Sequence, residues 1–296
     1  MGVNTRQPKL CADFITLMVL KRLSESVYCI LGGEKESNSG FVVGKNGVLV
    51  MDTNFSPYHA TLMLKEIRSV TQKPIRYVFN THYHSDHVFG NQVFPAKVIA
   101  CRECREIMNT LLETEWSKES IQKWTDENPE WKEKLANLKI TLPDVVFDEE
   151  YEIDLGNLKV SLKHLGGHTK DSSIAYIPSS KVLFAGDLIF QGRYPYTKDA
   201  EILRWLSALE TIQLMDFEVL VPGHGYLCNK EDVEHLIEYF ENLFENCRRF
   251  MQENLPLSEI VKRKEFLKFA RRNVNRHQEN IKKVYAELTQ GEKVEE

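Results

Sequence analysis

The chain has 296 residues, a formal net charge of −5 and 42% hydrophobic residues. This composition is typical of a globular protein and excludes an intrinsically disordered chain, and the length suffices for one large domain or two smaller ones. The mild acidity argues against a surface that binds nucleic acid over the whole molecule.

The cysteines and the apolar segments bear on the cellular compartment. Six cysteines are scattered over a long chain, so a disulfide-rich secreted domain is not expected and most should be reduced. Cys101 and Cys104 form a CxxC without a second CxxC, which we interpret as incidental. The apolar run 14–20, bounded by Asp13 and Lys21, predicts a strand rather than a signal peptide, and no stretch is long enough to span a membrane. We expect a cytoplasmic protein without a membrane partner.

The first third of the chain predicts an antiparallel meander followed by a strand, a helix and a strand. Three apolar runs are separated by glycine-containing turns, at 26–31, 41–43 and 48–51. The pair Asn46-Gly47 between two of these runs is the strongest short hairpin signal. Helical spacing over 57–71 precedes an expected strand over 75–79.

The rest of the chain alternates between helical and strand patterns. Residues 102–138 predict two inserted helices with a break near Asn128-Pro129, and strands then return at 158–162, 174–177 and 182–185. A helix over 199–215 and a strand over 217–221 follow, and from 230 the pattern is helical with a break at Pro256. We predict an α+β sandwich of two mixed sheets flanked by helices. Its main domain covers 1–229, and 230–296 form a helical extension packed on it.

The stretch THYHSDHVFGN, which follows the strand 75–79, contains candidate metal ligands. Three histidines and an aspartate fall within six positions, at His82, His84, Asp86 and His87. A single histidine is usually a solvated or hydrogen-bonded side chain, but four such residues together are hard to explain that way. Imidazole nitrogens combined with a carboxylate suit zinc better than calcium or magnesium. The spacing indicates parts of two metal sites.

Other polar residues at strand ends complete this pattern. His168 follows Gly166-Gly167, His224 lies between two glycines in Pro-Gly-His-Gly, and Asp187 follows Gly186 at the end of an apolar run. The remaining histidines have no glycine directly beside them and are interpreted as structural or exposed: His59, His164, His235 and His277.

These motifs occur in the order HxHxDH, Gly-His, Gly-Asp and Pro-Gly-His-Gly, which resembles the metallo-β-lactamase-fold hydrolase superfamily from Asn38 to Gly225. The resemblance implies an αββα sandwich with two zinc ions at one edge of the sheets. It implies one zinc on His82, His84 and His168, a second on Asp86, His87 and His224, and a bridge at Asp187. Asp52 would support the ligand loops, or serve only as a turn residue.

The chemistry implied by such a site is hydrolysis by a metal-bridging hydroxide, with Asp86 positioning the nucleophile and accepting its proton. The motifs around His84 and Asp187 are similar to SoxH-like and class B β-lactamase-like members. We expect a small carbonyl substrate, namely a β-lactam, lactone, ester or thioester. Promiscuous β-lactamase activity is a further expectation. Two alternatives on the same fold stay open, an iron-dependent persulfide dioxygenase and a metal-dependent phosphodiesterase or nuclease.

Residues after the bridging aspartate are candidates for substrate contact. Phe190 stands where class B1 β-lactamases have a lysine, so a substrate carboxylate would need another cation, for which Arg193 is the nearest candidate. Phe190, Arg193 and Tyr194 are therefore predicted to contact substrate, unless the loop 191–196 is a rigid turn with its tyrosines packed on the core.

The basic segment 262–283 carries nine Lys or Arg against two Glu. A solvated helix face is the default interpretation, and contact with a polyanion is the alternative. Nucleic acid is not the favoured partner, and a homodimer stays open.

Overall fold

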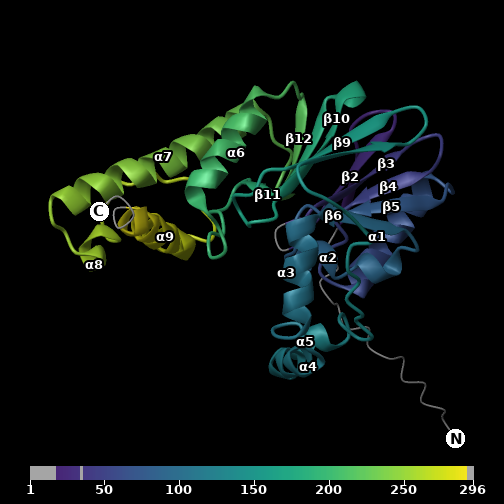
Figure 1. Cartoon of the computed structure of the whole chain (residues 1–296), viewed down its shortest axis with the longest axis horizontal. Coiled ribbons are helices and arrows are strands. Elements are labelled where there is room, and N and C mark those ends of the chain that lie inside the picture. Colours follow the sequence, from purple (N-terminus) through teal and green to yellow (C-terminus); the bar gives the residue numbers. More distant parts are fainter. Residues whose placement is uncertain (1–17, 34–35, 292–296) are drawn as a thin grey trace, which may run out of the picture.

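The computed structural model describes residues 18–33 and 36–291 and contains two β-sheets (Figure 1). The first sheet has the order β1-β2-β3-β4-β5-β6-β7. Its strands are β1 (Val19–Arg22), β2 (Val27–Leu31), β3 (Ser39–Val43), β4 (Val48–Met51), β5 (Ile75–Phe79), β6 (Lys97–Cys101) and β7 (Val145–Phe147). The second sheet has the order β12-β11-β10-β9-β8. Its strands are β8 (Glu150–Asp154), β9 (Lys159–His164), β10 (Ser173–Ile177), β11 (Val182–Phe190) and β12 (Val219–His224).

The helices fall into groups that cover the sheets or extend from them. Helices of the sandwich are α1 (Pro57–Val70), α2 (Ser85–Val88) and α6 (Ile202–Leu214). A second group is α3 (Arg102–Leu112), α4 (Lys118–Glu127) and α5 (Pro129–Lys132), and the third is α7 (Lys230–Gln252), α8 (Leu257–Ile260) and α9 (Asn275–Gly291). Figure 1 shows the third group as a helical unit beside the sandwich, in green to yellow, with α3 to α5 beneath the sheets. No helix in the described ranges is long and apolar enough to cross a membrane.

The predicted class, an α+β sandwich of two mixed sheets flanked by helices, is confirmed. The segment 102–138 contains three helices where two were expected. The predicted break at Asn128-Pro129 is present, and a second break falls at 113–117, where Ser117 caps the start of α4. Strand β11 continues to Phe190 instead of ending before Asp187, since the apolar residues after Asp187 remain fully buried. Most of the strand expected over 14–20 lies outside the described residues.

Two buried clusters fix the sheets relative to the helices. One fills the space between the sheets and includes Phe79, Phe184 and Val221. The other joins β11 and α6 to the C-terminal helices, with Trp205 at its centre packed on Phe240 at a ring separation of 5.0 Å. The C-terminal helices therefore share a core with the second sheet, which holds them beside the end of β11.

The parallel strands bring the predicted site residues to one edge. Strands β4, β5 and β6 are parallel neighbours in the first sheet, and β11 and β12 are parallel neighbours in the second. Because parallel strands end at the same edge of a sheet, Asp52 after β4 lies beside the loop after β5. In the second sheet Asp187 in β11 lies beside His224 at the end of β12.

Candidate metal centre

Five of the seven predicted ligands lie on short segments that follow strand ends, while Asp187 and His224 lie within β11 and β12. His82 and His84 lie in the loop after β5, and Asp86 and His87 follow in the single-turn helix α2. The helical turn rotates the chain, so the first pair faces one point and the second pair faces a neighbouring point. His168 lies in the loop between β9 and β10, after two glycines with positive φ.

Three histidine nitrogens converge on one point. His84 Nδ1 lies 3.1 Å from His82 Nε2 and 3.1 Å from His168 Nε2. His82 and His168 are buried, and Asp187 completes a group of four side chains whose ligand atoms lie within 4.8 Å of one another. This cluster has the ligand number and the donor types of a zinc site.

A second group gathers beside the first. Asp86 Oδ2 lies 3.2 Å from His224 Nε2 and 3.6 Å from His87 Nε2. Asp187 Oδ1 lies 3.3 Å from His87 Nε2, and its Oδ2 lies 3.5 Å from both His168 Nε2 and His224 Nε2. The structure thus brings all seven predicted residues together, and Asp187 is the side chain that contacts both groups.

Two buried polar atoms in this cluster lack hydrogen bonds. His87 Nε2 and Asp187 Oδ1 are both inaccessible to solvent and have no hydrogen-bond partner in the described part of the chain. Such orphaned atoms are rare in native proteins and need an explanation, and an ion is one that fits here. The donor set of imidazole nitrogens and carboxylates therefore suits a pair of borderline metal ions.

The protein favours different protonation states for different histidines of the site. Burial lowers the pKa of His82 and lowers that of His168 to about 3, which favours neutral imidazoles. Burial has the same tendency at His224 and His87, but nearby carboxylates outweigh it and raise the pKa of His224 to about 9 and that of His87 above its usual value. A metal must displace these protons, so its binding should strengthen as the pH rises towards 9.

The second ring nitrogen of each histidine has an oxygen partner. The pairs are His87 Nδ1 with Asp52 Oδ2 (2.8 Å), His84 Nε2 with Asp199 Oδ2 (3.2 Å), His168 Nδ1 with the Tyr196 carbonyl (3.1 Å), His82 Nδ1 with Thr81 Oγ1 (3.1 Å) and His224 Nδ1 with the Glu36 carbonyl (3.3 Å). Such contacts orient metal-binding imidazoles and raise their basicity. The rings are therefore held in a ligating orientation by the protein itself.

Asp52 does more than close a turn. Its buried carboxylate accepts hydrogen bonds from the Thr81 backbone N–H and hydroxyl, both at 2.8 Å, and contacts His87 at 2.8 Å. It adopts a left-handed φ of 52°, which asparagine also tolerates. These bonds join the end of β4 to the ligand loop after β5.

Replacing Asp52 by asparagine is expected to weaken zinc binding about 10–100-fold, because the amide cannot accept the His87 proton as the carboxylate does. Competition with a chromogenic chelator measures this affinity. The matched control is Asp154→Asn, whose exposed carboxylate accepts a turn hydrogen bond from Gly156 N at 2.6 Å. Equal zinc affinity in both variants would show that Asp52 is only a turn residue.

Four of the seven side chains, namely His84, Asp86, Asp187 and His224, line a cleft of about 450 Å³, a size that fits a small-molecule ligand. Of the three residues predicted to contact substrate, Phe190 and Arg193 line this cleft and Tyr194 does not. Tyr194 is buried and packs on Tyr239 at a ring separation of 5.7 Å. This corrects the prediction for Tyr194, whose ring lies in the core, while Tyr196 lies at the cleft.

Several cleft residues were not predicted from the sequence. Asp199 faces His84, Tyr83 and Trp116 contribute aromatic surface, and Arg276 reaches the cleft from α9. No local motif marks these positions. An arginine on a helix is too common to indicate a site, and only the tertiary structure brings Arg276 to the cleft of the metal centre.

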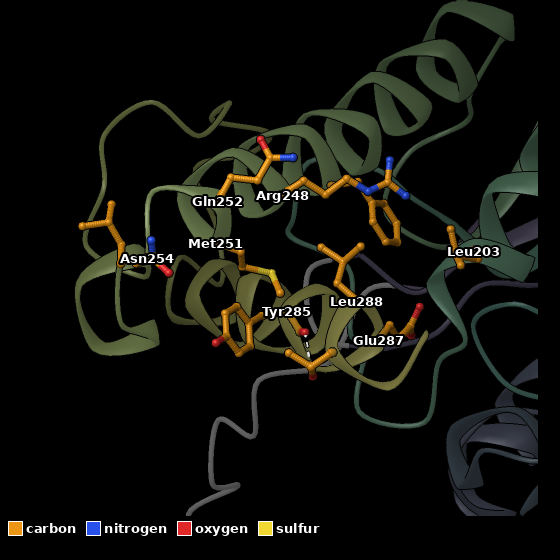
Figure 2. A pocket seen from close by; sticks show the side chains of 11 residues that line it. Leu203, Arg248, Met251, Gln252, Asn254, Tyr285, Glu287 and Leu288 are labelled. Atoms are coloured by element: carbon orange, nitrogen blue, oxygen red, sulfur yellow. Dashed lines mark hydrogen bonds between the residues drawn. The ribbon is translucent and has the colours of Figure 1, made fainter. Parts of the chain in front are cut away.

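Two other features could compete for the role of functional site. A larger groove of about 800 Å³ lies between α7 and α9, where Figure 2 shows Met251, Tyr285 and Leu288 facing one another. Its one carboxylate, Glu287, accepts a hydrogen bond from Ile202 N at 2.9 Å, so no cluster of metal ligands occurs among its described lining residues.

A third cluster of potential ligands comprises Cys101, Glu103 and His164. Both ring nitrogens of His164 face backbone carbonyls, that of Asp148 at 3.1 Å and that of Lys170 at 2.9 Å. The ring therefore has no nitrogen lone pair directed at a metal, which agrees with a structural role. His59, His235 and His277 also lie outside the seven-residue cluster.

The two-sheet sandwich with this His/Asp cluster at its edge places the chain in a class of folds that carry a candidate metal site at one edge of the sheets. A family model described as the metallo-beta-lactamase superfamily matches residues 32–224, and the chain belongs to that superfamily. The chain is 22% identical over 253 residues to the linear primary-alkylsulfatase of Pseudomonas sp. (strain ATCC 19151), a match that covers 73% of this chain and 48% of that protein.

Two further proteins are similar to this chain at low sequence identity. The chain is 24% identical over 153 residues to the acyl-coenzyme A thioesterase MBLAC2 of Homo sapiens, covering 49% of this chain and 54% of that protein. The stereoselective inverting sec-alkylsulfatase Pisa1 from Pseudomonas sp. has a similar structure, with a TM-score of 0.71, 17% identity, and coverage of 91% of this chain and 50% of that one. The chain spans about half the length of these proteins, and the structural likeness shows the fold.

Proposed function

We propose that this superfamily member is a dizinc hydrolase that cleaves a small carbonyl substrate, with a thioester or ester as the best candidate. The observation that carries this proposal is the position of Asp187, whose two carboxylate oxygens lie 3.3–3.5 Å from histidines of both groups. A carboxylate placed in this way can join two metal ions. Two complete ligand sets also argue against the alternative of a dioxygenase with one iron.

Two bound zinc ions would supply a hydroxide near neutral pH and polarise the substrate carbonyl. The chain's own residues hold and orient the reactants. Asp86 has one carboxylate oxygen directed at His224 and His87, and the carboxylate borders the cleft, so it can position the nucleophile and accept its proton. Phe190 stacks on the His224 ring at 5.7 Å and excludes water from one side of the site.

The names of the relatives guide the choice among substrates. A thioesterase and an alkylsulfatase are among the proteins similar to this chain, and both names denote cleavage of an ester-like bond. Hydrolysis of an alkyl sulfate is therefore a second candidate, favoured by the arginines that line the cleft. A cytoplasmic location stays a prediction.

A substrate panel tests the proposal. The purified protein is stripped of metal, reloaded with zinc, manganese or iron, and assayed on an acyl thioester, an aryl ester, a lactone, a β-lactam, an alkyl sulfate and a phosphodiester. We expect the zinc form to hydrolyse the thioester or the ester, and His84→Ala to lose this activity. Oxygen consumption with a persulfide by the iron form, without hydrolysis by the zinc form, would contradict the proposal.

A further inference from the structure

Three cationic side chains line the cleft of the metal centre, and one of them comes from beyond the residues that the family model matches. Arg193 and Lys198 follow β11, whereas Arg276 lies in the first turn of α9. Burial lowers the pKa of Arg193, Asp187 opposes this change, and the charges of Arg276 and Arg272 lower the pKa further. The guanidinium groups are therefore near enough to repel one another.

The position of Arg276 is fixed by packing. Its guanidinium lies over the Tyr196 ring, 5.1 Å from the ring centroid. Four residues later, and so on the same face of α9, buried Asn280 accepts a hydrogen bond from Thr197 Oγ1 at 2.8 Å and donates one to the Pro195 carbonyl at 3.2 Å. These bonds attach α9 to the segment on either side of Tyr196. No ion pair joins Arg276 to a carboxylate within 18–33 and 36–291.

The acidic residues of the cleft are mostly engaged elsewhere. Asp199 contacts His84 at 3.2 Å, while Asp86 and Asp187 face the histidines of the metal centre. Only Glu115, which is exposed, remains among the described acidic residues that line the cleft. Among the described residues that line the cleft, Arg276 therefore shares it with only one acidic side chain, exposed Glu115, that does not face a histidine of the metal centre.

Apolar and aromatic side chains from a different part of the chain complete the lining. Leu111 lies in α3, Trp116 follows that helix, and Tyr83 lies between His82 and His84. The cleft thus combines cations from the C-terminal helices and the loop after β11 with apolar surface from the inserted helices. A ligand that satisfies both would carry an anionic group and an apolar part.

We propose that Arg276 binds an oxyanion group of the substrate, such as a carboxylate, sulfate or phosphate, at a point separate from the bond that is cleaved. Leu111 and Trp116 contact the apolar part of the same substrate. This inference assigns a substrate class to the cleft of the proposed hydrolase and rests on that function for the reaction. Arg276 gives the C-terminal helices a part in substrate selection.

Binding of a non-hydrolysable amphiphile tests the inference without catalysis. Octanesulfonate carries an anionic group on an apolar chain, and octanol is its neutral counterpart. Titration calorimetry on the zinc-loaded protein should show octanesulfonate binding at least about tenfold weaker in Arg276→Gln, because a charge-assisted contact is lost. Octanol binding should stay within about twofold, and Arg276→Lys should retain part of the affinity for the anion.

The matched control is Arg271→Gln, which removes the same charge from an exposed position on the same segment and should leave both ligands unaffected. Equal thermal unfolding midpoints verify that the variants fold. Octanesulfonate affinity within twofold of the wild type in Arg276→Gln, or an equal loss in Arg271→Gln, would overturn the inference, since the first would place the anion elsewhere and the second would indicate only general attraction.

A kinetic comparison separates this inference from the proposed function. For an ester that the enzyme hydrolyses, Arg276→Gln should raise the KM of a carboxylate-bearing analogue at least tenfold and leave kcat and the neutral analogue unchanged. Absence of hydrolysis of every ester would contradict the proposed function while the calorimetric result still decides the role of Arg276. A loss confined to kcat would contradict the anion-binding role.

Discussion

Replacing Asp187 by asparagine is expected to lower kcat/KM at least about a thousandfold, because the carboxylate that faces histidines of both ligand groups loses its charge. The substitution keeps the shape of the side chain, which is buried. Zinc content should fall below two per chain, since a neutral amide binds zinc poorly and cannot bridge two ions. Elemental analysis and steady-state kinetics measure both effects.

Asp216→Asn is the control for Asp187→Asn. Asp216 is an exposed aspartate in the turn before β12, 3.1 Å from Lys181 Nζ, and surface ion pairs of this kind contribute little to stability. This control should keep full zinc content and activity. An Asp187→Asn variant with two zinc ions and a kcat/KM within tenfold of the wild type would rule out a bridging role for Asp187.

Replacing Gly223 by alanine is expected to damage the metal centre without removing any ligand. A Cβ atom at position 223 would lie 1.8 Å from Asp187 Oδ1 and 2.8 Å from Asp187 N. These distances are far below van der Waals contact, so Asp187 must move or β12 must separate from β11. We expect zinc affinity at least about tenfold weaker and a free energy of unfolding lower by about 1–3 kcal/mol, as for other overpacked interiors.

Chelator competition and urea unfolding test the Gly223→Ala prediction. Gly33→Ala serves as the control, because a Cβ there meets nothing within 4 Å although the residue has a φ of +71°. It should cost about 1 kcal/mol of backbone strain and leave zinc affinity unchanged. Normal zinc affinity in Gly223→Ala would mean that Asp187 does not need the space that this glycine leaves.

The ligand cluster could be predicted from the sequence because its ligands lie in recognisable local sequence patterns. His168 and His224 adjoin glycines at strand ends, and His82, His84 and His87 follow an apolar strand directly. The end of β11 was placed too early for a related reason. Gly186-Asp187 has the composition of a turn, but the strand continues because its later residues are buried between the sheet and the helices.

The lining of the cleft could not be predicted in the same way. Asp199 lies 115 positions from His84 and has no motif around it. Tyr194 and Tyr196 are two positions apart in an irregular loop, and only the packing of Tyr194 on Tyr239 decides which ring reaches the cleft. Arg276 depends on the docking of α9, which buried Asn280 secures through side-chain bonds that local propensity does not encode.

Titration of the metal-free protein with zinc, monitored by hydrolysis of the best ester or thioester, tests the central claim most directly. Two ligand groups that share Asp187 predict that two equivalents bind and that activity reaches its maximum only as the second equivalent is taken up. Full activity with one equivalent, together with no binding of a second, would contradict a two-metal hydrolase.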